Sequence, residues 1–194
     1  MPGPRIDPGG REPSSPAPET LESWLTDLGL DPGSRSEREG IVAWDLVLDG
    51  RRRRRLPVTL ILDPTVGLIV WGLLAPPLGD GLRKTYRTLL RWNDEYPLAK
   101  FSVTDDGRPI LAVELPLRWL DGDELGLALA RVVLIADRLF EETRPWLWIG
   151  GRVPEGYGQA PPAGETLLGR YAARLPELAE PAPAEPAPAE PAPG

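Results

Sequence analysis

The chain has 194 residues and a formal net charge of −7, with 25 prolines and 21 glycines but no cysteine and no histidine. This acidic balance disfavours general binding to nucleic acids or to anionic membranes, because both usually require a basic face. The missing cysteine and histidine remove disulfides, thiolates, the usual general base and the usual metal ligand. We therefore expect no catalytic residue, no cofactor and no metal site.

The two ends of the chain differ from its middle. Residues 1–18 are rich in Pro, Gly and Ser, and 179–194 repeat Pro-Ala-Pro-Ala-Glu. We expect both segments to be disordered, with the tail in extended polyproline II conformation. A solvated spacer is one interpretation of the tail, and a docking peptide for some partner is the other. Residues 19–145 then form the domain, and 146–178 form an extension that packs on it.

No secretory signal is visible, because no apolar run follows a basic segment near Met1. The longest apolar stretch, 66–75, is too short to span a bilayer. We expect a cytoplasmic protein that does not bind membranes.

The first half of the chain predicts one short helix and three strands. Apolar residues at helical spacing place the helix over 20–30, and alternation places a strand over 41–48. The turn signal at 49–50 predicts a hairpin to a return strand over 56–62. A third strand, 66–74, is apolar on both faces. Tight links between these strands indicate an antiparallel meander.

The second half predicts a helix, two strands and a long final helix. The helix covers 80–93, the strands 99–103 and 110–115, and the final helix runs from a capping signal at 121–124 until Pro145 ends it. The order is α-βββ-α-ββ-α. This pattern favours an α+β fold with an antiparallel sheet of about five strands and three helices.

The sequence also predicts the positions of several individual side chains. For the helix over 80–93 we expect Asp80 as N-cap and one buried stripe, formed by Leu82, Tyr86, Leu89, Leu90 and Asn93. Asn93 could end this helix in a left-handed conformation or contact a ligand. Trp92 and Trp119 are expected at the rim of the domain, whereas Trp146 and Trp148 are expected to pack back on it, followed by a short helix over 166–175.

The stretch 89–137 resembles the bacterial YbjN family, which is described as sensory transduction regulators. The shared elements are Leu89-Leu90 with Asn93, Ala99-Lys100-Phe101, an acidic turn, a Glu-Leu-Pro ending at Pro116, and an acidic-capped helix. The resemblance covers residues 20 to 145. The element order is also similar to that of type III secretion chaperones. That likeness implies a homodimer that binds an extended segment of a client protein.

The strand over 66–74 carries the first candidate site. One of its faces should meet the helices, whereas the other, with Ile69, Trp71 and Leu73, needs a different cover. We interpret this second face as a partner surface, with a second copy of the chain as the partner. The alternative is cover by the C-terminal extension with its tryptophans.

Five consecutive arginines form the second candidate site, Arg51, Arg52, Arg53, Arg54 and Arg55. In a strand, Arg51, Arg53 and Arg55 would face one side and the other two the opposite side. A protruding, solvated hairpin explains them, and the alternatives are an acidic protein partner or nucleic acid.

These features together predict a non-catalytic protein-interaction module, chaperone-like or adaptor in kind, that binds a protein segment and forms a homodimer. One alternative is a nucleic-acid-linked regulator that uses the arginines at 51–55. Another is an enzyme of unrecognised type, for which the sequence shows no convergent pair of catalytic groups.

Overall fold

The computed structural model describes residues 16–78, 82–148, 152–155, 157, 165–176 and 178. Residues 1–15, the tail 179–194 and the expected N-cap Asp80 lie outside the described residues. The described strands are β1 (Ser34–Arg38), β2 (Ile41–Leu48), β3 (Leu56–Asp63), β4 (Gly67–Leu73), β5 (Lys100–Val103) and β6 (Pro109–Leu115). The described helices are α1 (Pro18–Asp27), α2 (Leu82–Glu95), α3 (Gly122–Arg138), α4 (Phe140–Leu147) and α5 (Glu165–Tyr171), with single turns η1 (Leu117–Trp119) and η3 (Ala172–Arg174).

The six strands form one antiparallel sheet in the order β1-β2-β3-β4-β6-β5. The predicted α+β class and the meander over β2, β3 and β4 are confirmed. β1 was not predicted, because all five of its residues are exposed and its sequence, SRSER, carries no apolar alternation. An edge strand with no buried side chain leaves no signal in the hydrophobic pattern.

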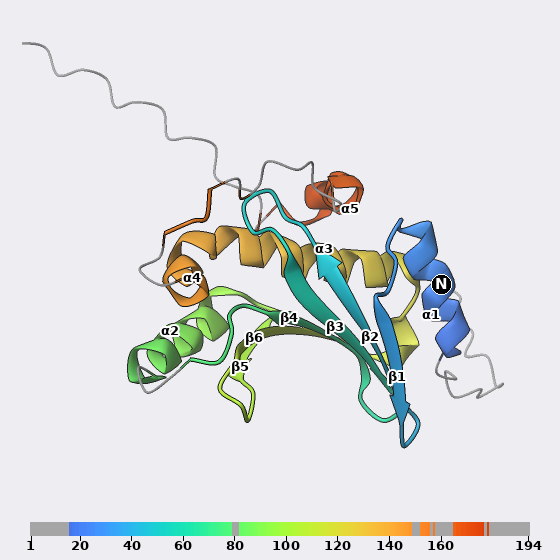
Figure 1. The fold of residues 1–194 in the computed structure, drawn as a ribbon. Helices are drawn as coiled ribbons and strands as arrows, with labels where there is room; N and C mark the ends of the chain where they lie inside the picture. The colour runs from blue at the N-terminus through green and yellow to red at the C-terminus, as the bar shows by residue number, and fades with distance from the viewer. Residues whose placement is uncertain are drawn as a thin grey trace, which may run out of the picture.

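The helices pack on one face of this sheet (Figure 1). α3 crosses that face, where its Val132 lies against Gly72 of β4. The alternating burial of β2 shows the same sidedness, since Val42, Trp44, Leu46 and Leu48 are buried and their neighbours are not. In Figure 1 no described helix lies on the opposite face of the sheet.

α3 is the central helix of the protein and is buried on nearly all sides. Its N-cap is Asp121, whose Oδ1 accepts hydrogen bonds from the amides of Asp123 (2.9 Å) and Glu124 (2.8 Å), so the predicted cap is confirmed. The sheet covers one side of the helix, and α5 packs on the other side. Such two-sided cover explains why this helix is apolar around most of its circumference.

The end of the last long helix differs from the prediction. α3 ends at Arg138, and after Leu139 a second helix, α4, continues to Leu147 with Pro145 inside it. Pro145 therefore does not end the helix. Its ring carries no N–H, so one backbone hydrogen bond is missing in the last turn, and the helix ends two residues later at Leu147.

The predicted stripe of α2 is also partly wrong. Tyr86 and Leu90 are 45% and 69% exposed, whereas Thr85, Leu89, Trp92 and Tyr96 form the buried side. Trp92 is fully buried against the ring of Phe101, with ring centroids 5.3 Å apart, and so is not a rim residue. The spacing of four, three and four residues fits a helix face equally well, and only the position of β5 decides which face is covered.

Candidate protein-binding surfaces

The uncovered face of the sheet carries the first predicted site. Ile69, Trp71 and Leu73 of β4 are half-buried, and they alternate with Leu68 and Val70, which face α3 and are fully buried. Their cross-strand neighbours are also apolar, namely the half-buried Ile61 on β3 and the buried Ile110 and Ala112 on β6. We call this set the open face. Its centre is apolar and spans three adjacent strands.

Polar side chains stand beside this row on both neighbouring strands, since Thr59 on β3 pairs with Trp71 and Glu114 on β6 pairs with Ile69. On one side Asp45 accepts hydrogen bonds from the hydroxyls of Thr59 (2.8 Å) and Ser34 (2.7 Å). On the other side Lys100 Nζ lies 2.7 Å from a carboxylate oxygen of Glu114. An apolar centre with a polar, hydrogen-bonded rim is typical of protein–protein interfaces.

The described part of the C-terminal extension packs on the helical side of the sheet. The ring centroids of Trp146 and Trp92 lie 5.5 Å apart. The ring of Trp148 packs against the rings of Tyr157 and Phe140 at the start of α4. Beyond these contacts, Tyr171 of α5 is buried against α3. These contacts lie across the sheet from Trp71 and therefore leave the open face uncovered by Trp146 and Trp148.

The arginines at 51–55 lie in a loop, so the expected strand alternation is wrong. The carboxylate of Asp137 on α3 accepts hydrogen bonds from the backbone amides of Arg51 (2.7 Å), Arg52 (3.0 Å) and Arg53 (2.7 Å). Asp137 is only 7% exposed. The backbone of these three consecutive residues therefore bends around one buried carboxylate, and a bent backbone cannot continue as an extended strand.

Two of the five arginines also turn toward the protein. Arg53 is 7% exposed and donates from Nη1 to the carbonyl of Arg54 at 2.9 Å, and the amide of Arg54 donates to the hydroxyl of Tyr157 at 2.7 Å. Arg51, Arg52 and Arg55 are exposed. The loop sits on the helical side, so the structure does not bring the arginines together with Ile69, Trp71 and Leu73.

Asn93 neither ends α2 nor lies free for a ligand. Its side-chain amide pairs with the backbone of Phe101, accepting from the amide at 2.7 Å and donating to the carbonyl at 3.0 Å. β5 is the last strand of the sheet, and this residue covers its outer edge as a neighbouring strand would. Asn93 therefore has a structural role that a one-dimensional pattern does not show.

Replacing Asn93 with alanine should lower the free energy of unfolding by about 1–2 kcal/mol, because two backbone groups of β5 lose their partner. Chemical denaturation monitored by tryptophan fluorescence measures this change. The exposed neighbour Asp94 provides the control, since Asp94→Ala removes no contact to β5. Equal stability of the two variants would mean that water replaces Asn93 at the strand edge.

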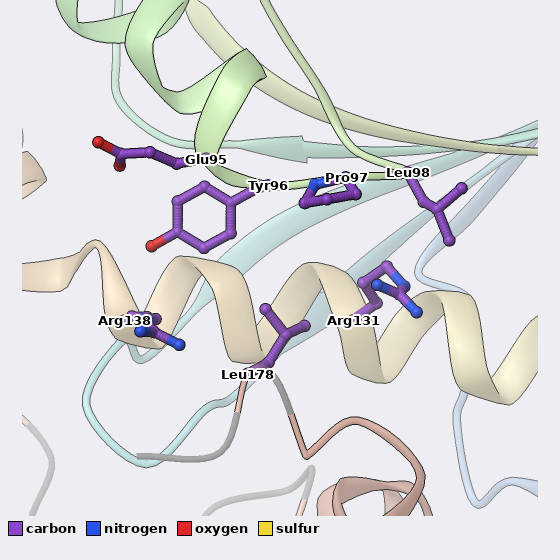
Figure 2. Close-up of a pocket in the computed structure, with 7 residues that line it drawn as sticks. All are labelled: Glu95, Tyr96, Pro97, Leu98, Arg131, Arg138 and Leu178. Carbon is purple, nitrogen blue, oxygen red and sulfur yellow. The ribbon is translucent and has the colours of Figure 1, made fainter. Parts of the chain in front are cut away.

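A groove that the sequence did not reveal runs between α3 and the β5 edge. It consists of two cavities of about 450 and 480 Å³, which share Leu98 and Arg131 in their walls. Figure 2 shows the first cavity between the segment Glu95–Leu98 and α3, with Leu178 lying over the helix between Arg131 and Arg138. The second cavity continues past the start of β5 to Trp119.

The residues around this groove combine apolar and charged groups. Leu98 and Trp119 are 77% and 61% exposed, so the expectation that Trp119 lies at the rim is in keeping with the structure. Burial raises the pKa of Tyr96 above the usual value of a phenol. Among the described residues, no cluster of acidic side chains is arranged to hold a metal ion.

Comparison with models of protein families shows to which family this chain belongs. A family model described as "YbjN: Putative bacterial sensory transduction regulator" matches residues 17–144. The chain belongs to the YbjN family. The predicted resemblance is thus confirmed. A search of curated proteins finds no significant match.

The YbjN match begins next to the start of α1 and ends within α4. It includes the open face, the arginine loop, Asp137 and most of the groove, but not the C-terminal extension with Tyr157, Tyr171 and Leu178. Of the helices in the described ranges, none has the length and apolar character needed to cross a membrane.

Proposed function

We propose that this protein is a non-catalytic regulatory module that binds protein through the open face. The observation that carries the proposal is the half-buried apolar row of Ile69, Trp71 and Leu73 in the middle of a sheet face that no described helix covers. Membership of a family of regulators supports the regulatory role. An exposed apolar patch of this kind usually marks an interaction surface.

The partner that we propose for the open face is a second copy of the chain. Two flat sheet faces can stack about 10 Å apart with their side chains interdigitated. In a dimer with a two-fold axis, both copies contribute the same surface, so the open face of one copy would pack on the open face of the other. The polar groups at the two edges, Asp45 with its hydroxyl partners and Lys100 with Glu114, would then form a solvated rim. The first cavity of the groove, between the segment 95–98 and α3, has none of these residues in its wall and would stay available for another segment, as the chaperone-like interpretation requires.

Substitution of Trp71 by glutamate should weaken the homodimer by at least about thirty-fold, because a central tryptophan at an interface commonly contributes 2 kcal/mol or more. Sedimentation equilibrium over a range of concentrations measures the dissociation constant. Trp119→Glu is the matched control, since it places the same charge at an exposed tryptophan outside the open face. Circular dichroism establishes that both variants are folded.

Parent protein that remains monomeric at all concentrations would refute the homodimer. If the parent dimerises and Trp71→Glu dimerises equally well, the interface lies elsewhere and the open face is not its centre.

A further inference from the structure

The arginine loop, residues 51–55, holds two guanidinium groups that form no ion pair with a described carboxylate. Arg53 is only 7% exposed, and its Nη1 donates to two neutral acceptors, the carbonyl of Arg54 at 2.9 Å and the hydroxyl of Tyr157 at 3.4 Å. Its Nε is buried and makes no hydrogen bond to a described residue, and the same holds for Nε and Nη1 of Arg54. Three buried N–H donors of this loop thus have no acceptor among the described residues.

This arrangement is costly for a folded chain. A guanidinium group does not lose its proton in a protein, so burying it without an anion costs free energy that a pKa shift cannot relieve. Arg55 adds backbone strain, because its φ of 52° lies in the left-handed region that a long side chain disfavours. Costs of both kinds are concentrated at sites that bind ligands.

The carboxylates near the loop do not balance its charge. Asp137 uses both of its oxygens on the backbone amides of residues 51–53, and Oδ1 of Asp49 accepts a hydrogen bond from the amide of Arg55 at 2.6 Å. Glu155 lies two residues before the tyrosine that contacts the loop, and it is exposed. The five guanidinium groups exceed these three carboxylates by two positive charges. A phosphate group carries about 1.5 to 2 negative charges near pH 7 and matches this excess.

The geometry of the loop favours a small phosphorylated ligand. Nη2 of Arg53 and of Arg54 is neither among the buried atoms nor hydrogen-bonded to a described residue, so one side of each guanidinium is open to a ligand. Guanidinium groups bind phosphate oxygens through paired hydrogen bonds, and one phosphate can engage two of them. Outside the loop, acidic residues outnumber basic ones even more strongly than in the whole chain, which disfavours a long polyanion such as nucleic acid.

We propose that Arg53 and Arg54 bind the phosphate group of a small ligand. The hydroxyl of Tyr157 accepts a hydrogen bond from the amide of Arg54 at 2.7 Å and donates one to its carbonyl at 3.0 Å. A residue outside the YbjN match, which covers 17–144, thus holds the backbone that presents Arg54. The site lies on the helical side of the sheet, so it depends neither on the open face nor on dimerisation.

Thermal unfolding of the full-length protein with inorganic pyrophosphate tests this proposal, at an ionic strength held constant with sodium chloride because salt screens exposed charges. The midpoint of the parent should rise with pyrophosphate concentration, as for any ligand that binds only the folded state. In isothermal titration calorimetry, Arg54→Gln should weaken pyrophosphate binding by roughly tenfold or more, because a charge-assisted interaction is lost. Without ligand, this variant should be at least as stable as the parent, since no ion pair to a described residue is removed.

Arg87→Gln is the matched control, since it removes the same charge at an exposed position of α2 and should bind pyrophosphate like the parent. Trp71→Glu should also leave this binding unchanged, which separates the site from the proposed homodimer. A parent that binds no pyrophosphate would overturn the proposal, and so would equal binding by the parent and Arg54→Gln.

Two further probes, ATP and a short thymidine oligonucleotide, identify the source of the phosphate. Similar affinities for pyrophosphate and ATP would support a site for a free anion, whereas a preference for ATP of roughly tenfold would support a nucleotide. An oligonucleotide that binds more tightly than both would overturn the proposal in favour of a nucleic-acid surface, and its affinity would fall steeply with salt.

Discussion

Replacing Asp137 with asparagine should lower the free energy of unfolding by about 3 kcal/mol, because the carboxylate accepts three backbone hydrogen bonds in a buried site. Asparagine has nearly the same shape but only one acceptor oxygen. Its amide nitrogen would replace one of the two oxygens and face either the amide of Arg51 or those of Arg52 and Arg53. At least one buried amide would then lose its partner, and the arginine loop would lose the group that holds it against α3.

Urea denaturation followed by circular dichroism measures this loss. Asp94→Asn is the matched control, since it makes the same chemical change at an exposed position of α2 and should shift stability by less than about 0.5 kcal/mol. Similar midpoints for both variants would show that the loop conformation does not depend on Asp137.

A methyl group at Gly126 should lower the free energy of unfolding by about 2 kcal/mol, in the range found for overpacked cores. The added Cβ would lie 2.5 Å from Cε2 of Tyr171, well inside contact distance. Tyr171 is 1% exposed, so its ring cannot move aside without losing its packing against α3. The substitution should therefore loosen the C-terminal extension from the helix that it covers.

The same substitution at Gly169 should have the opposite sign. This glycine lies within α5, and an added Cβ would meet nothing within 4 Å. Alanine there should raise stability by up to about 1 kcal/mol, because it favours the helix over the unfolded chain. Thermal unfolding of both variants gives the comparison, and stabilisation by Gly126→Ala would contradict the packing of Tyr171 on α3.

Both substitutions act on the helical side of the sheet. They do not touch Ile69, Trp71 or Leu73, so the self-association proposed for the open face should be unchanged in the fraction that remains folded. Trp71→Glu should show the reverse pattern, with altered association and smaller change in the helical packing. The two sides of the sheet can thus be tested separately.

Local sequence patterns determined most of the strands. β2, β3, β4 and β6 carry alternating or continuous apolar residues, and each was predicted within a few residues of its observed ends. The N-cap at Asp121 was also predicted, because capping depends only on a side chain and the next three residues. These features depend on neighbours in the sequence, which the chain itself displays.

The tertiary structure decided the features that depend on distant partners. The carboxylate of Asp137 holds the arginine loop in its bent conformation, although the two are more than eighty residues apart in the sequence. Asn93 covers the edge of β5, whereas the sequence predicted a helix end there. The all-polar β1 gave no sequence signal, and the groove appears only when the segment before β5 lies beside α3. In each case the deciding contact joins residues far apart in the chain, so its energy is absent from any local pattern. The sequence already assigned Ile69, Trp71 and Leu73 to the face away from the helices, but whether the C-terminal extension covers that face depends on the tertiary structure, in which Trp146 packs on Trp92 on the helical side.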